Sequence, residues 1–153
     1  VELSGLASDI FTYFGLGCRN VSKILIPKDY DFKPLFQAFE PYKELINHNK
    51  YANNYEYHKA IYLMNQVTHI DNGFVILKPD EGLGSPVGVL YYQPYTNIEG
   101  AIAYIDSNRE SIQCVVSNNK KVPNSIPFGR TQEPNLYDYA DGIDTIEFLA
   151  TPS

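Results

Sequence analysis

The sequence predicts an α/β fold with a mostly parallel sheet that carries helices on both faces. Segments with apolar residues at helical spacing alternate with short β-branched runs along the chain. Apolar residues make up 44% of the 153 residues and charged residues 20%, which is the composition of a folded globule. We therefore expect a single domain over residues 1–153, built as a three-layer sandwich with one sizeable core.

The first half is predicted to hold three helices and one strand. Apolar residues from Leu3 to Phe14 recur at helical spacing and predict a helix over 4–15. The β-branched run 21–26 predicts a strand that Pro27 ends. Asp31 can cap a second helix, which Pro41 bends or ends. A third helical pattern covers 50–65.

The second half is predicted to add a hairpin, three strands and a helix. The hairpin joins 67–70 to 74–77 through the turn Asp71-Asn72-Gly73. Thr96 and Glu99 form a potential capping box for a helix that continues to Ile105. The runs predicted as strands are 87–92, 112–116 and 145–149. Residues 118–135 lack any apolar period and are predicted to form a long surface loop.

The charge and cysteine content limit the function. The formal net charge of −6 argues against a nucleic-acid partner. No run reaches the ~20 apolar residues that a transmembrane helix needs. Two cysteines, Cys18 and Cys114, do not make a disulfide scaffold, so we expect free thiols and a cytoplasmic location. The chain begins with Val1, which suggests a piece of a longer protein.

Cys18 is the candidate nucleophile. It follows Gly15-Leu16-Gly17 at the junction between the first predicted helix and the first predicted strand. The glycines remove bulk beside the sulfur, and Arg19 and Lys23 favour the reactive thiolate. The C-terminal end of the preceding helix acts against the thiolate. The pattern therefore indicates a nucleophile that needs basic neighbours or a bound cofactor for its activation.

Other chemical patterns are weaker. The run 15–20 nearly matches a dinucleotide fingerprint, but a helix precedes it and a strand follows, which is the reverse of the required order. Cys114 lies in the apolar run 112–116 and is expected to be a core residue. His48, His58 and His69 match no metal-ligand spacing, so no metal site is predicted.

Three motifs, in order, resemble the aldehyde dehydrogenase superfamily. The first is Phe14 to Lys23 with Cys18, and the second is Asp80 to Val87, where Glu81 is the natural counterpart of a ribose-binding glutamate and Asp80 the alternative. The third is Pro127-Phe128-Gly129-Arg130. The segments "YFGLGCRNVSK" and "YADGIDTIEFL" are most similar to the long-chain acyl-CoA reductase (LuxC) family.

This resemblance implies the catalytic domain of an NADPH-dependent fatty acyl-CoA reductase. Cys18 would form an acyl thioester, and hydride from NADPH would release an aldehyde. Glu81 would bind the cofactor, most of which would be held by a dinucleotide-binding domain that this chain lacks. We therefore expect the fragment to be inactive alone, because orientation of the cofactor against the thioester supplies much of the rate. The expected partners are an acyl-CoA or other acyl thioester and, as an option, further copies of the chain.

Two other functions remain open. The same fold could serve as an aldehyde dehydrogenase that works in the oxidative direction. Alternatively, the domain could have lost its chemistry and serve assembly, with the predicted strand 145–149 pairing across a subunit interface.

Overall fold

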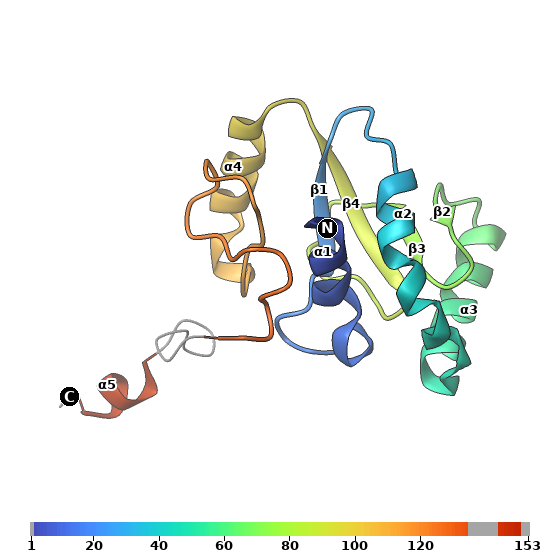
Figure 1. The fold of residues 1–153 in the computed structure, drawn as a ribbon, viewed down its shortest axis with the longest axis horizontal. Helices are drawn as coiled ribbons and strands as arrows, with labels where there is room; N and C mark the ends of the chain where they lie inside the picture. The colour runs from blue at the N-terminus through green and yellow to red at the C-terminus, as the bar shows by residue number, and fades with distance from the viewer. Residues whose placement is uncertain (1, 135–143, 151–153) are drawn as a thin grey trace.

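The computed structural model describes residues 2–134 and 144–150 and has helices around a small sheet (Figure 1). The helices are α1 Glu2–Phe11, α2 Lys33–Phe39, α3 Asn49–Met64, α4 Ile98–Ser107 and α5 Thr145–Ala150. The strands are β1 Lys23–Pro27, β2 Ile70–Asp71, β3 Ile76–Pro79 and β4 Val89–Tyr95. Short 3₁₀ segments cover Thr12–Gly15, Glu40–Asn47 and Arg109–Ser111.

The four strands form one mostly parallel sheet in the order β1-β4-β3-β2. β4 pairs in parallel with β1 on one side and with β3 on the other, and β2 pairs antiparallel with β3. The long connection from β1 to the rest of the sheet contains α2 and α3. The parallel strands β3 and β4 are joined by residues 80–88, which contain no helix. The α/β class and the mostly parallel sheet are therefore confirmed, and the hairpin around Asp71 is present.

Apolar side chains leave the sheet on both faces, and helices cover each face. Leu77 and Leu90 belong to a core cluster with Ala7, Phe11 and residues of α2. Ile76 and Val89, which alternate with them along the strands, pack with the tyrosines of α3. Figure 1 shows α1 and α2 together on the near side of the sheet, and α3 lies at the end that carries β2.

Three local predictions were wrong. Residues 112–116 form no strand, and only an isolated bridge pairs Val116 with Ile126. Residues 145–149 lie in α5, a helix, so the strand proposed for subunit pairing does not exist there. The helix α4 is capped by Asn97, whose side chain accepts from the Gly100 N–H at 2.8 Å, and not by Thr96.

The first helix ends earlier than predicted. α1 stops at Phe11, and Tyr13, Phe14 and Gly15 follow with φ of 54°, 61° and 72°. Left-handed backbone is unfavourable for residues with a Cβ atom, so this turn requires support from its surroundings. The apolar side chains of Tyr13 and Leu16 are about two-thirds exposed (65% and 68%). The helix was predicted to continue to residue 15 because apolar residues recur at helical spacing up to Phe14. In the structure, however, the apolar side chains just after Phe11 face solvent instead of the core.

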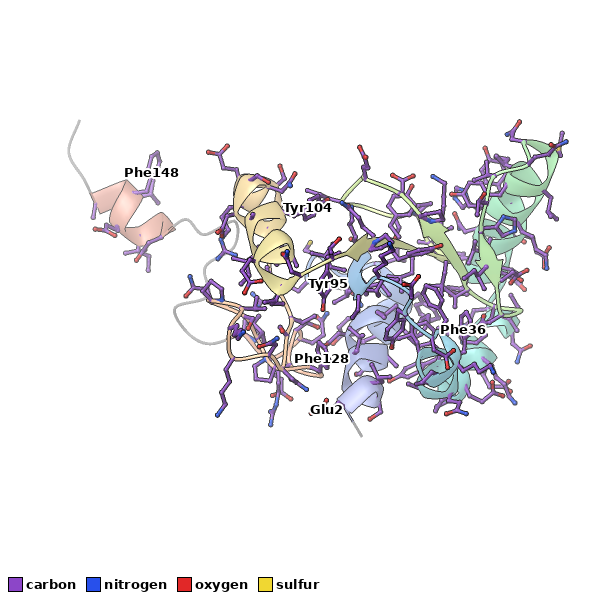
Figure 2. The ribbon with its side chains drawn as sticks, turned by 90° about the horizontal axis from the view of Figure 1, so that it is seen from above. Glu2, Phe36, Tyr95, Tyr104, Phe128 and Phe148 are labelled. Atoms are coloured by element: carbon purple, nitrogen blue, oxygen red, sulfur yellow. The ribbon has the colours of Figure 1, made fainter. Side chains whose placement is uncertain are left out.

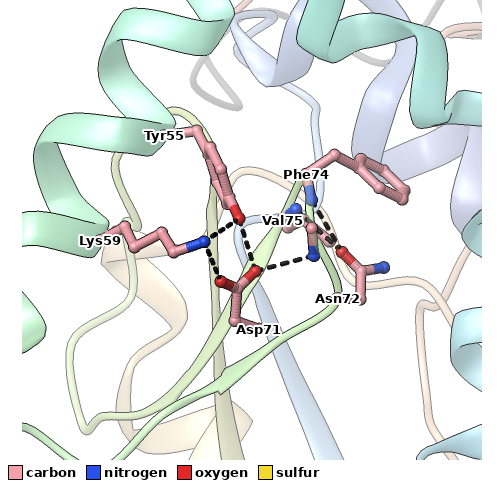
Figure 3. Close-up of polar contacts among 7 residues, drawn as sticks. Tyr55, Lys59, Asp71, Asn72, Phe74 and Val75 are labelled. Atoms are coloured by element: carbon pink, nitrogen blue, oxygen red, sulfur yellow. Dashed lines mark hydrogen bonds and ion pairs between the residues drawn. The ribbon is translucent and has the colours of Figure 1, made fainter.

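A polar cluster joins α3 to the β2–β3 hairpin (Figure 3). Lys59 Nζ lies 2.8 Å from one carboxylate oxygen of Asp71, and the Tyr55 hydroxyl donates to the other at 2.7 Å. The Gly73 N–H also donates to Asp71 at 2.8 Å. Burial alone raises the pKa of the Asp71 carboxyl, but these hydrogen bonds outweigh burial and leave the pKa below its usual 3.8.

Gly88 fixes the distance between α3 and the start of β4. Its φ is +80°, and a Cβ atom there would lie 2.9 Å from Tyr55 Cα. Gly73 also has a positive φ, +98°, but nothing lies within 4 Å of the position of its Cβ. A side chain at position 73 would therefore meet only the strain of a positive φ, whereas a side chain at position 88 would also clash with α3.

We expect Gly88→Ala to destabilise the fold by about 2–4 kcal/mol, because it adds a clash with backbone to the strain of a positive φ. Gly73→Ala is the matched control and should lose only about 1 kcal/mol from strain. Urea unfolding of both variants measures the difference. Equal destabilisation would contradict the close approach at Gly88.

The lowered pKa of Asp71 makes stability depend on pH. Its stabilising contribution is present above the unfolded-state pKa, near pH 4, and is lost as pH falls through the lower folded-state pKa. We expect Asp71→Asn to be less stable than wild type at pH 7 and the gap to shrink toward pH 3. Urea unfolding of both proteins across this range tests the prediction, and a gap that stays constant would contradict it.

Candidate functional site

Asn20 holds the turn that carries Cys18. Its side-chain Nδ2 donates to the carbonyl oxygens of Asp9, Ile10 and Thr12 at 2.9, 3.2 and 2.8 Å. Its Oδ1 accepts from the Gly17 N–H at 2.8 Å. One amide side chain thus satisfies carbonyls at the end of α1 and closes the turn around Cys18.

Gly17 is required by this closure. A Cβ atom at position 17 would lie 2.5 Å from Asn20 Oδ1, well inside van der Waals contact. The absence of a side chain lets the Gly17 N–H reach the Asn20 oxygen. The glycine before Cys18 therefore allows the turn to close on Asn20.

Asp9 anchors the loop 128–131 against α1. The carboxylate is 2% exposed and accepts from the Gly129 N–H at 2.7 Å and from the Thr131 N–H and hydroxyl at 3.2 and 3.0 Å. A Cβ atom at Gly5 would lie 2.9 Å from the Phe128 carbonyl, so the loop backbone touches α1 directly. The buried carboxyl group accepts three hydrogen bonds and keeps the loop beside the Cys18 turn.

Arg19 links the Cys18 turn to the same loop and to the second cysteine. Its Nε donates to the Thr131 carbonyl at 2.7 Å. The Arg19 carbonyl accepts a long contact of 3.7 Å from Cys114 Sγ. Cys114 is half-buried and not the fully buried core residue that was predicted, and neither cysteine is in a disulfide.

The loop 81–84 lies along the start of β1. Lys23 Nζ donates to the Glu81 carbonyl at 2.9 Å and to the Tyr104 hydroxyl at 2.7 Å, and Tyr104 in turn donates to the Glu81 carbonyl at 3.1 Å. The Ser22 hydroxyl donates to the Leu83 carbonyl at 2.8 Å. β1, α4 and this loop therefore meet at Lys23.

The two acidic residues that follow β3, Asp80 and Glu81, differ in their contacts. Asp80 forms an ion pair with Lys78 and accepts from the Gly82 N–H at 2.8 Å, and both interactions lower the pKa of its carboxyl. The side chain of Glu81 is exposed, while its carbonyl carries the contacts to Lys23 and Tyr104. Asp80 is thus committed to the structure, and Glu81 keeps an accessible carboxylate.

A cavity of about 470 Å³ lies between β1 and the segment 112–117. It is lined by β1, by residues of α4, by Ile112 to Ser117, and by Leu3, Leu6 and Leu35 of α1 and α2. Cys18 and Cys114 both line it. Figure 2 shows Tyr104 on α4, Tyr95 at the end of β4 and Phe128 in the late loop around this region. The volume is in the range of ~300–1,000 Å³ that small-molecule sites occupy.

The structure thus brings the three predicted motifs into one region. The turn with Cys18 touches the loop after Phe128 through Arg19, and the strand that follows it touches the loop with Glu81 through Lys23. Cys18 is exposed and lines the cavity. The cations expected to favour its thiolate, Arg19 and Lys23, have defined partners in the neighbouring loops.

Sequence reasoning missed Asn20, Asp9 and Tyr104. No pattern marks Asn20, since its partners are main-chain carbonyls. Asp9 did leave a signal, because an acidic residue lies between the apolar residues Ala7 and Ile10 of α1 and is buried there. Tyr104 was one of thirteen tyrosines, which sequence alone could not rank.

No cluster of three or more His, Cys, Asp or Glu side chains that could hold a metal ion occurs among the described residues. His58 has a pKa lowered by burial, and its ring contacts Tyr62. His69 Nδ1 lies 2.7 Å from the Val67 carbonyl. These two histidines have contacts around α3 and the hairpin, and neither lines the cavity.

No family model, curated protein or solved structure matches the chain. In the part of the chain that is described, no helix has the length and apolar character needed to cross a membrane. Function must therefore be argued from the site itself.

We expect Asn20→Ala to lower the free energy of unfolding by about 2–3 kcal/mol, because it leaves carbonyls and the Gly17 N–H without their partner. Hydrogen exchange at Gly17 should become faster in the folded protein. Asn54→Ala is a control, since the Asn54 side chain is exposed and donates to the Lys50 carbonyl at 2.7 Å. If Asn20→Ala proved as stable as Asn54→Ala, the result would contradict the role of Asn20 in anchoring the Cys18 turn.

Proposed function

We propose that this chain is the catalytic domain of an NADPH-dependent fatty acyl-CoA reductase. The observation that carries the proposal is the exposed Cys18, which lies on a tightly held turn and lines a cavity of about 470 Å³. A nucleophile needs access to substrate and a fixed position, and the turn provides both. The resemblance of the three motifs supplies the substrate class and the reaction.

In the proposed reaction, the Cys18 thiolate attacks the carbonyl carbon of the acyl-CoA thioester. The main-chain N–H of Cys18 stabilises the negative oxygen that forms. Collapse expels the CoA thiolate and leaves an acyl thioester on Cys18. Hydride transfer to this carbonyl and expulsion of the Cys18 thiolate then release the aldehyde, so that the thioester is reduced by two electrons.

NADPH supplies the hydride when it is bound. Glu81 fits a role in holding the cofactor, because its carboxylate is exposed while its main chain is fixed by Lys23 and Tyr104. Asp80, the alternative, is paired with Lys78. Most of the cofactor contacts would come from a dinucleotide-binding domain outside this chain, and we place the protein in the cytoplasm, where both thiols stay reduced.

A role in assembly is the second candidate. Ile146, Phe148 and Leu149 of α5 are 81%, 72% and 76% exposed. A short helix with large apolar side chains in solvent favours contact with another protein surface, including a second copy of this chain. This role is compatible with catalysis and does not require the strand pairing that the sequence suggested.

Incubation of the chain with hexanoyl-CoA tests the proposal. We expect one acyl group per chain, located on Cys18 by peptide mass spectrometry, with release of an equal amount of CoA thiol. Cys18→Ser should lower the rate of this labelling by more than about a hundredfold, because a serine hydroxyl is a much weaker nucleophile than a cysteine thiolate.

Cys114→Ser is the matched control, since Cys114 lines the same cavity but is half-buried. It should keep the acylation rate of wild type. Labelling of Cys114 in preference to Cys18, or no labelling of the folded chain, would refute the proposed chemistry.

A further inference from the structure

In the described part of the chain, β1 has one edge without a neighbouring strand. Its other edge pairs with β4, since the Ser22 carbonyl accepts from the Tyr91 N–H at 3.1 Å and the Lys28 N–H donates to the Tyr95 carbonyl at 2.9 Å. Residues at even positions along this stretch therefore direct their peptide groups to β4. By the alternation of a strand, Lys23 and Leu25 direct theirs to the opposite edge.

That outer edge lines the cavity. Lys23 and Leu25 are both cavity residues, and Ile112 to Ser117 line the same cavity. Within residues 2–134 and 144–150, the N–H and C=O groups of Lys23 and Leu25 have no hydrogen-bonding partner. Polar and apolar side chains both line the cavity, and β1 adds two peptide groups that have no partner in the described part of the chain.

The unpaired peptide groups of Lys23 and Leu25 favour one part of an acyl-CoA substrate over the other, because the acyl chain is a hydrocarbon and the pantetheine chain contains amides. A hydrocarbon chain placed here would cover the peptide groups without pairing them, which is unfavourable. A chain that carries amides can pair with them, as an added strand pairs with a sheet edge. The pantetheine arm of CoA is such a chain, because it is narrow, extended and contains two amide groups.

We propose that the cavity along β1 binds the pantetheine arm of the thioester substrate as an added strand. The thioester end lies at Cys18, which precedes β1, and the two amides lie beside Lys23 and Leu25. The inference rests on the proposed function and assigns one arm of the substrate to this cavity. The fatty acyl arm then leaves Cys18 in another direction.

The decisive experiment compares two substrates on the wild-type chain. S-hexanoyl-pantetheine carries both amides, and S-butyl thiohexanoate carries none but has the same acyl group and an alkyl leaving group. The rate of acylation at Cys18 is followed by intact-protein mass spectrometry and corrected for each thioester's rate with a small thiol in solution. We expect the corrected rate to be at least about tenfold higher for the pantetheine thioester, as one or two added hydrogen bonds predict.

The outcomes separate the two proposals. Equal corrected rates would overturn the pantetheine site and leave Cys18 acylation intact. Acylation by neither compound, or acylation at Cys114 alone, would overturn the proposed function itself. A preference for the pantetheine thioester at Cys18 supports both.

A variant pair tests the edge directly. Leu25→Pro removes the outward N–H while the β1–β4 ladder, which uses even positions, is kept. Leu25→Ala shortens the side chain but keeps the N–H. We expect the proline variant to lose most of the preference for the pantetheine thioester and the alanine variant to retain it; retention by a folded proline variant would overturn the inference.

Hydrogen exchange provides a readout that does not depend on folding of a variant. The amide protons of Lys23 and Leu25 should exchange quickly in the wild-type chain and slow at least about threefold with saturating S-methyl-pantetheine, an unreactive thioether. Slow exchange without the compound would show that another group already pairs with this edge, and it would overturn the inference.

Discussion

The side chain of Asn20 is the constraint on which the site depends. Its four hydrogen bonds join the end of α1 to the turn that precedes β1, so the first helix and the first strand are fixed to each other through the segment that carries Cys18. Because Asp9 belongs to the same helix and holds the loop 128–131, that loop is fixed to the turn as well. The position of the thiol is therefore set by groups from three separate parts of the chain.

A second consequence concerns the left-handed residues Tyr13 and Phe14. They lie between Thr12, whose carbonyl Asn20 binds, and Gly17, whose N–H Asn20 also binds. The chain must reverse direction within these few residues, and the hydrogen bonds at both ends hold the reversal in place. Unfavourable backbone of this kind persists where its surroundings determine it, and here it leaves apolar side chains exposed beside the thiol.

The sequence predicted the helices α1 to α4 and the mostly parallel sheet, because these follow from apolar spacing. It also predicted an exposed Cys18, from local glycine chemistry. It failed at 112–116, where an apolar run looked like a strand but faces a cavity, and at 145–149, where β-branched residues form a helix. The contacts of Asn20, Asp9 and Tyr104 join residues through main-chain carbonyls and amides of distant segments. Such contacts depend on how the elements assemble, so no local pattern contains them.

The two edges of the sheet are protected in different ways. β2 is only two residues long and is tied to α3 through Asp71, so it offers little backbone to another molecule. β1 is longer and has no strand on its outer side among the described residues, and residues of α4 and of the segment 112–117 line the same cavity as β1. Figure 1 shows α4 and the loop after it beside β1 on this side, where the sheet of a second molecule would have to approach. Their placement guards the protein against edge-to-edge aggregation.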